Sequence, residues 1–142
     1  GAPGGSVLAG SGDVIRRCVR YRRMLGGAMR QVGHFAAAGL FALDHNLERL
    51  AEDHANARAI AERLAPSARS ALDMAAVQTN ILVFDVAADA PDAPTVVERA
   101  GRRGVLVFAF GPRTIRAVTH LDVSRADCLR AADVLLESVE AR

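Results

Sequence analysis

The side chains with the greatest capacity for chemistry in this sequence are its arginines. The chain has 18 residues of the lysine and arginine types, and every one of them is arginine. A guanidinium group keeps its charge at neutral pH, and its planar N–H donors match the two oxygens of a carboxylate or a phosphate. The positions of the arginines therefore indicate which anions the chain is suited to bind.

Arg116 opens the segment RAVTHLDVS and is the first candidate for such a site. The alternation of side chains over residues 114–121 predicts a strand. One face of this strand would carry Ile115, Ala117, Thr119 and Leu121, and the other Thr114, Arg116, Val118 and His120. The second face is polar enough to line a site or to meet a neighbouring domain. The sequence leaves one alternative open, in which Arg116 pairs with Asp122 or Asp85.

A second group of arginines lies closer to the N-terminus. Its members share a segment with Tyr21 and are Arg16, Arg17, Arg20, Arg22, Arg23 and Arg30. A basic face with an aromatic side chain is typical of nucleic-acid binding. An amphipathic helix with a solvated arginine side explains the same pattern, because apolar residues run among the arginines. Gly26 and Gly27 precede Arg30, and free backbone N–H groups there could hold a phosphate.

The histidines and cysteines do not predict a metal site or a nucleophile. His45 and His54 are nine residues apart, which differs from the i, i+4 spacing of helical zinc motifs. We therefore expect no metal. Cys18 and Cys128 fall on the apolar sides of predicted helices, so neither a catalytic thiol nor a disulfide framework is expected. A cytoplasmic location fits this use of cysteine.

Composition and charge indicate a globular protein. The chain is 51% apolar and 24% charged, with a formal net charge of +2. This charge is too small to require nucleic acid or a membrane as a partner, and neither is expected. The most apolar run, residues 32–43, has 12 residues, whereas a bilayer span takes about 20. That run is predicted to form a buried helix.

The elements that must position these side chains change in type along the chain. The first predicted helix is capped by Ser11 or Asp13 and runs to about residue 25. Two further predicted helices cover residues 28–44 and 46–65. The predicted strands cover residues 81–86, 105–110 and 114–121. Between the first two strands, a short helix should begin near Pro94. A last helix should follow Ser124, which forms a capping box with Asp127.

This order of elements predicts an α+β fold. Connecting helices come first, followed by a small, mainly antiparallel three-stranded sheet with helices over one face. The strands on either side of the turn at residues 111–113 should pair as a hairpin. The predicted division of the chain is residues 1–66, a glycine-rich lead and a helical segment, and residues 67–142, an α+β small domain.

Five segments carry a resemblance to a known family. They are GAPGGSVLAGS (1–11), RRMLGGAMRQVG (22–33), LERLAEDHANAR (47–58), QTNILVFDV (78–86) and IRAVTHLDVS (115–124). In this order they resemble the low-specificity L-threonine aldolases, which are aspartate-aminotransferase-like (fold type I) pyridoxal-phosphate enzymes. The resemblance implies the C-terminal part of such an enzyme. The end of the large domain and the connecting helices would lie in residues 1–66, and the small domain in residues 67–142.

The resemblance also implies a reaction and a cofactor. In that family, the motif GAPxGS follows the lysine that binds the cofactor covalently. Gly1 opens this motif here, so we expect a fragment that starts just past that lysine. Because the chain has no lysine, the fragment alone is expected to bind no cofactor and to be inactive. The full-length enzyme is expected to use pyridoxal 5'-phosphate as a lyase that cleaves L-threonine or L-allo-threonine to glycine and acetaldehyde.

Roles for individual residues follow from the same resemblance. Arg116 matches the family arginine that holds the α-carboxylate of the amino-acid substrate. Arg30 matches a family arginine near the cofactor, and Arg23 stands where relatives often carry lysine. Asn80 belongs to the TN motif and receives no role. Active sites of the family lie at dimer interfaces, so a homo-oligomer, either a dimer or a tetramer, is expected.

Two hypotheses from other classes stand beside this one. The first is a basic helical module that binds RNA or DNA through the segment from Arg16 to Arg30. The second is a structural oligomerisation domain, in which the apolar helix over residues 32–43 requires a partner.

Overall fold

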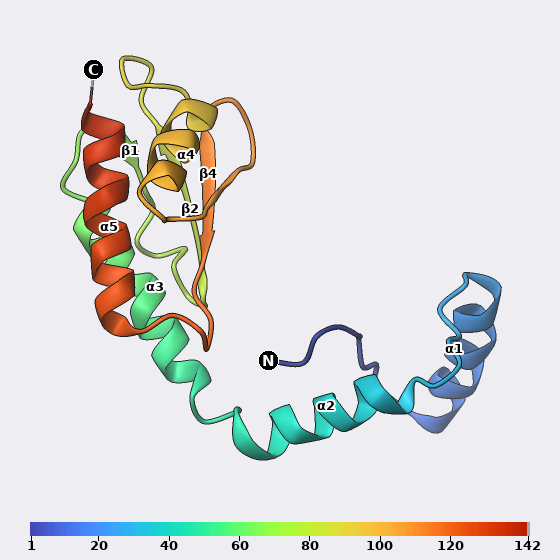
Figure 1. Ribbon diagram of the computed structural model, residues 1–142. Coiled ribbons are helices and arrows are strands. Elements are labelled where there is room, and N and C mark those ends of the chain that lie inside the picture. The colour runs from blue at the N-terminus through green and yellow to red at the C-terminus, as the bar shows by residue number, and fades with distance from the viewer. Residues whose placement is uncertain (142) are drawn as a thin grey trace. The chain divides into compact units, whose positions relative to one another are not determined.

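The computed structural model describes residues 1–141 of the chain. The described chain divides into two compact units, of which the first is Gly1–Glu48 and the second begins at Arg49. The first unit holds α1 (Gly12–Met24) and α2 (Gly33–His45), and Figure 1 labels the elements of both units. The second unit consists of α3 (Leu50–Leu64), β1 (Ser70–Ala71), β2 (Ile81–Val86), α4 (Ala93–Arg102), β3 (Phe108–Ala109), β4 (Thr114–Val118) and α5 (Arg125–Glu140).

The first unit consists of two helices that bury none of their residues. Helix α1 begins after Ser11, one of the two predicted caps, although the Ser11 side chain makes no capping hydrogen bond, and it carries the arginine-rich face. Helix α2 begins at Gly33 rather than at residue 28. Leu40 and Leu43 on α2 are 63% and 62% exposed. The prediction that residues 32–43 form a buried helix is therefore wrong for the described chain, because no other part of the first unit covers them.

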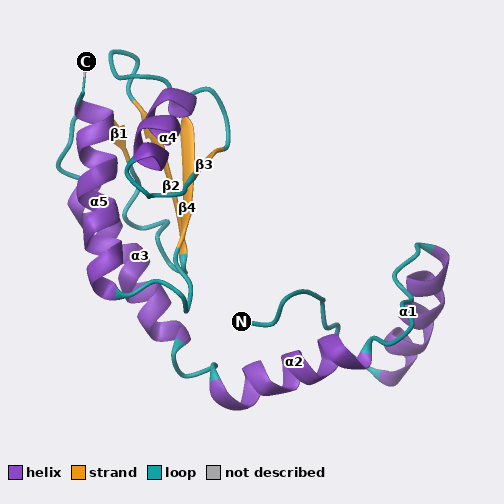
Figure 2. Ribbon diagram, viewed as in Figure 1, coloured by secondary structure: helices purple, strands orange, loops and turns teal. Residues whose placement is uncertain are grey.

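The second unit is built on a four-stranded sheet with the order β1-β2-β4-β3. Every pair of neighbouring strands in it is antiparallel. Helices α3, α4 and α5 cover one face of this sheet (Figure 2). The α+β fold is confirmed, and the expected hairpin between β3 and β4 is present. The sheet has one short strand, β1, more than the three that the sequence predicted.

One apolar core holds the second unit together. Alternate residues of β2 and β4 turn toward the helices, because successive side chains of a strand point to opposite faces. The largest fully buried side chains are Leu64, Leu82, Phe84, Val96, Ile115, Leu135 and Val139. They come from three helices and two strands. Burial of each such side chain contributes roughly 1.5–3 kcal/mol to the free energy of unfolding.

Side-chain caps fix where two of these helices begin. Asp92 accepts a hydrogen bond from the backbone N–H of Thr95, with an N···O distance of 2.9 Å. At α5, the predicted capping box is present: Ser124 accepts from the N–H of Asp127, and Asp127 accepts from the N–H of Ser124. Aspartate replaces the usual glutamate in this box, and its carboxylate still reaches back to the cap.

Other element limits differ from those predicted. Strand β3 spans only Phe108–Ala109 instead of residues 105–110. Helix α3 begins at Leu50 instead of near residue 46, and it packs against α5 within the second unit. The compact units accordingly divide at residues 48 and 49, whereas the division after residue 66 stays a prediction about the family's domains. His54, on α3, is exposed.

Candidate functional site

The face of the sheet opposite the helices carries the candidate site. On β4, Ile115 and Ala117 are buried against the core, whereas Thr114, Arg116 and Val118 lie on the other face. The predicted alternation is confirmed for residues 114–118, but the strand ends at Val118 rather than at residue 121, and Leu121 is 43% exposed. On β2, the residues that share the uncovered face are Ile81, Val83 and Asp85. The site is therefore a mixed surface of apolar and polar side chains with one guanidinium.

Arg116 lies at the centre of this face. It stands opposite Val83 on β2 and opposite Phe108 on β3, so one row of side chains crosses three strands. Directly opposed residues of an antiparallel pair place their side chains on the same face, about 5 Å apart. Val83 is 47% exposed and Phe108 is 62% exposed. The cation is thus flanked by two apolar side chains that remain open to a ligand.

No acidic side chain of residues 1–141 neutralises Arg116. Among these residues, its guanidinium takes part in none of the ion pairs within 4.0 Å. The two acids considered from sequence are engaged elsewhere: Asp85 accepts from the Thr114 hydroxyl at 2.5 Å, and Asp122 lies 3.2 Å from Nδ1 of His120. The structure does not bear out the alternative in which Arg116 pairs with either of them.

A reciprocal hydrogen-bond clamp closes the end of the β2–β4 pair beside this site. The side-chain Nδ2 of Asn80 donates to the carbonyl oxygen of Thr119 at 2.8 Å. The backbone N–H of Thr119 donates to the carbonyl oxygen of Asn80 at 3.0 Å. The clamp fixes the course of the chain three residues beyond Arg116. Sequence reasoning assigned Asn80 no role, and its position directly before a strand was the only available signal.

Thr119 also ties the strand end to helix α3. It is 3% exposed, and its hydroxyl donates to the carbonyl oxygen of Asp53 at 2.6 Å. The carboxylate of Asp53 is itself buried and receives both Nη groups of Arg49 at 3.3 Å. Asp53 lies in the first turn of α3, where the helix dipole favours a negative charge. The hydrogen bond from Thr119 links the end of β4, and with it the strand that carries Arg116, to helix α3.

The other two predicted site residues, Arg23 and Arg30, belong to the first unit. Both are exposed, Arg23 in the last turn of α1 and Arg30 in the turn before α2. In the described part of the chain neither forms an ion pair, and the one pair on α1 joins Arg16 to Asp13. The connection between the helices is tight at Gly26, whose φ of +77° suits glycine. The backbone N–H groups of Gly26 and Gly27 donate to the carbonyl oxygens of Arg23 and Arg22 at 3.3 and 2.8 Å, so the free N–H groups expected there for a phosphate are not present.

Two further findings limit the kinds of site in the described chain. Within residues 1–141, no three histidine, cysteine, aspartate or glutamate side chains gather closely enough to hold a metal ion. None of the helices described here has the length and apolar character needed to cross a membrane. The cysteines, Cys18 and Cys128, are both free.

The chain matches a known family along most of its length. A family model described as beta-eliminating lyase matches residues 1–88. The low specificity L-threonine aldolase of Escherichia coli (strain K12) is 42% identical over 132 residues, which cover 93% of this chain and 38% of that protein. The resemblance predicted from the five segments is confirmed by these matches.

Two more distant relatives are also named low-specificity L-threonine aldolases. The probable low-specificity L-threonine aldolase 2 of Arabidopsis thaliana is 40% identical over 131 residues, covering 89% of this chain and 36% of the relative. The low-specificity L-threonine aldolase of Candida albicans is 30% identical over 140 residues, covering 99% of this chain and 36% of the relative. The chain thus spans little more than a third of the length of the curated relatives it matches.

Proposed function

Because this chain belongs to the beta-eliminating lyase family, we propose that it is the C-terminal part of a longer lyase that cleaves β-hydroxy amino acids. Similarity to proteins named threonine aldolases supports this reaction, and the substrates proposed are L-threonine and L-allo-threonine. The products would be glycine and acetaldehyde. The share of the relatives that the chain covers, 38% or less for these two, supports the idea of a longer enzyme.

In this proposal, Arg116 binds the α-carboxylate of the substrate. The observation that carries it is the partly exposed guanidinium at the centre of the uncovered sheet face, with no carboxylate among residues 1–141 to neutralise it. Two parallel N–H···O bonds to a carboxylate fix both its position and its plane. A substrate held this way has a defined direction for the Cα–Cβ bond that is cleaved.

The proposed cofactor of the longer enzyme is pyridoxal 5'-phosphate, which accepts the electrons released when the carbon–carbon bond breaks. The residues of this chain alone do not fit it, because covalent attachment needs a lysine amine and the chain has none. The chain by itself is therefore proposed to be inactive. Arg30 and Arg23 are proposed to lie near the cofactor in the longer enzyme. A cytoplasmic homo-oligomer remains part of the proposal.

A chimeric enzyme tests the proposal. In it, this chain replaces the matching C-terminal segment of the Escherichia coli relative, which keeps that protein's preceding residues. We expect the chimera to release acetaldehyde from L-threonine. We expect Arg116→Gln to lower kcat/KM about 100-fold, because two charge-assisted hydrogen bonds are lost. The kcat/KM of Arg116→Lys should lie between those of the unmodified chimera and Arg116→Gln, since an ammonium group cannot form the planar pair of hydrogen bonds.

The matched control is Arg102→Gln on α4, which removes an exposed arginine paired with Glu98. Its kcat/KM should stay within about twofold of that of the unmodified chimera, because exposed ion pairs contribute little. Equal activity of the Arg116→Gln and Arg102→Gln chimeras would refute the role of Arg116. Acetaldehyde release by the 142-residue chain with added cofactor would refute the proposed inactivity.

Two other hypotheses, a nucleic-acid-binding module and an oligomerisation domain, remain open, and each predicts a different experimental result from the lyase. A nucleic-acid module would bind oligonucleotides through α1 with an affinity that falls steeply as salt increases. An oligomerisation domain would associate through α2 without any effect of Arg116→Gln. Activity in the chimera that depends on Arg116 favours the lyase over both.

A further inference from the structure

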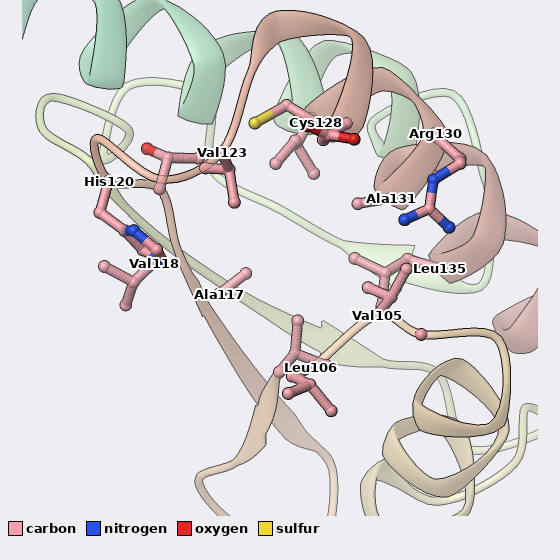
Figure 3. Close-up of a pocket in the computed structure, with 15 residues that line it drawn as sticks. Val105, Leu106, Ala117, Val118, His120, Val123, Cys128, Arg130, Ala131 and Leu135 are labelled. Carbon is pink, nitrogen blue, oxygen red and sulfur yellow. The ribbon is translucent and has the colours of Figure 1, made fainter.

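The second unit contains a cavity that the proposed lyase site does not use. It lies between the end of β4, the segment of residues 104–107 and helix α5, with a volume of about 270 Å³ (Figure 3). Its lining is mostly apolar and includes Val105, Ala117, Val123, Ala131 and Leu135. Ala117 belongs to the helix-facing side of β4, opposite to Arg116. Val118, on the Arg116 side of β4, also borders the cavity, whereas Arg116 itself does not line it.

An arginine lies at one end of this cavity. Arg130 extends from α5 toward Val105 and Leu135 (Figure 3). Arg130 is exposed, and its Nη1 donates to the carbonyl oxygen of Arg103 at 3.3 Å, which places the guanidinium at the rim of the cavity. Within residues 1–141 no carboxylate lies within 4.0 Å of its nitrogens. Several N–H donors of Arg130 thus remain for a ligand.

The lining contains one acidic side chain, and its carboxylate is already hydrogen-bonded to the residue that caps helix α5. Asp127 lines the cavity, and its Oδ2 accepts from the N–H and the hydroxyl of Ser124 at 3.1 and 2.6 Å. These hydrogen bonds, and to a smaller extent the charge of Arg130, lower the pKa of Asp127, whose carboxylate is hydrogen-bonded to the helix cap. His120 at the other end faces Asp122 at 3.2 Å. Arg130 therefore supplies a positive charge at the cavity that forms no ion pair within 4.0 Å among residues 1–141.

We infer that this cavity binds a small aliphatic carboxylate of about six to eight carbons. The alkyl chain would lie among the apolar side chains, and the carboxylate would accept hydrogen bonds from Arg130. The volume matches roughly nine non-hydrogen atoms, if each takes the roughly 30 Å³ that one water molecule occupies in the liquid. Typical drug-sized ligands need larger pockets, from about 300 Å³ upward. A single inserted leucine or phenylalanine side chain would leave much of the space empty.

Cys128 provides a reporter for occupancy. It lines the cavity, is 2% exposed, and burial raises the pKa of its thiol. Cys18 is the other cysteine and is removed by Cys18→Ser. A bound alkyl chain should slow the modification of Cys128 by a thiol reagent, because it fills the route to the sulfur. The slowing should saturate with ligand concentration.

The test titrates n-octanoate into the 142-residue chain that carries Cys18→Ser, by calorimetry and by the rate of Cys128 modification. We expect a Kd on the order of a millimolar, as suits a ligand of about ten atoms. Arg130→Gln should weaken binding about tenfold, whereas Arg102→Gln should not change it. Ala131→Leu should weaken binding by occupying part of the cavity, with circular dichroism as the check of folding. Octylamine should bind at least tenfold more weakly than octanoate.

Several results would overturn the inference. Absence of saturable octanoate binding to a folded chain would do so, as would equal affinity for octanoate and octylamine. Unchanged affinity in Arg130→Gln would show that the arginine is not part of the site. If sedimentation showed that octanoate converts a dimer to a monomer, a second copy of the chain would be the natural occupant. The Arg130 and octylamine arms remain decisive even if Ala131→Leu fails to fold.

Discussion

The two compact units of this chain use similar helices in opposite ways. Helix α5 buries Ala132, Leu135 and Val139 in the core of the second unit. Helices α1 and α2 bury no residue at all within the described chain. Both of the latter have 13 residues, and isolated helices shorter than about 12–15 residues are marginal in water.

This difference shows where each unit obtains its stability. The second unit contains the partners of its own apolar side chains, so its residues specify a packed structure. The first unit carries apolar side chains on α2 and a basic face on α1 that the described chain does not cover. We expect its helices to depend on a partner that supplies buried contacts, because propensity alone contributes too little.

The largest expected effect tests this difference with a matched pair of leucines. Leu82→Ala in β2 removes a side chain that is 1% exposed and should lower the free energy of unfolding by about 2–5 kcal/mol. Leu40→Ala in α2 removes one that is 63% exposed and should change it by less than about 0.5 kcal/mol. Urea denaturation followed by circular dichroism measures both. Similar losses in the two variants would contradict the comparison.

A smaller effect is expected from the link between β4 and α3. Thr119→Val keeps the shape of the side chain but removes the donor to the carbonyl oxygen of Asp53. That oxygen lies inside α3 and keeps a helical N–H donor, so only one hydrogen bond is lost and the free energy of unfolding should fall by about 0.5–1.5 kcal/mol. The same exchange at the exposed Thr79 should have less than half of this effect. Denaturation midpoints of the two variants compare them directly.

The smallest effect concerns the helix caps and pH. Hydrogen bonds from Ser124 lower the pKa of Asp127 below its usual value of 3.8, and those from Thr95 do the same for Asp92. The unfolded chain therefore binds protons more readily than the folded chain in this range. The stabilisation is present above about pH 4 and is lost as pH falls through the lowered values.

Ser124→Ala removes the hydroxyl that donates to the Asp127 carboxylate, and Asp127→Asn removes the carboxylate that titrates. Both should therefore reduce the loss of stability between pH 5 and pH 2. The double variant should lose no more stability than either single variant, because the two side chains act as one unit. Urea midpoints across this pH range provide the measurement. A pH dependence identical to that of the unmodified chain would show that the cap does not contribute.

The features that the sequence predicted well are those set by local pattern. The alternation in residues 114–118 placed Arg116 on the correct face of the sheet, and the spacing of Ser124 and Asp127 predicted their capping box. Both follow from the geometry of a few consecutive residues. The order of helices and strands, and with it the α+β fold, followed from similar patterns.

The features that escaped prediction depend on distant partners. Strand β1 has only two residues and exists because it pairs with β2. The burial of Asp53 depends on Arg49 and on a threonine far along the chain. The clamp between Asn80 and Thr119 joins residues 39 positions apart. No periodicity in the sequence encodes such contacts, so the support beneath Arg116 became visible only in three dimensions.

The two borders of the sheet have a consequence for how copies of the chain can associate. The outer strands, β1 and β3, contain two residues each. Such short borders expose too few free backbone N–H and C=O groups to act as a template for another strand. Growth of the sheet from one molecule into the next should therefore be suppressed. We expect any self-association to proceed through side chains, leaving fibril formation disfavoured even in concentrated solution.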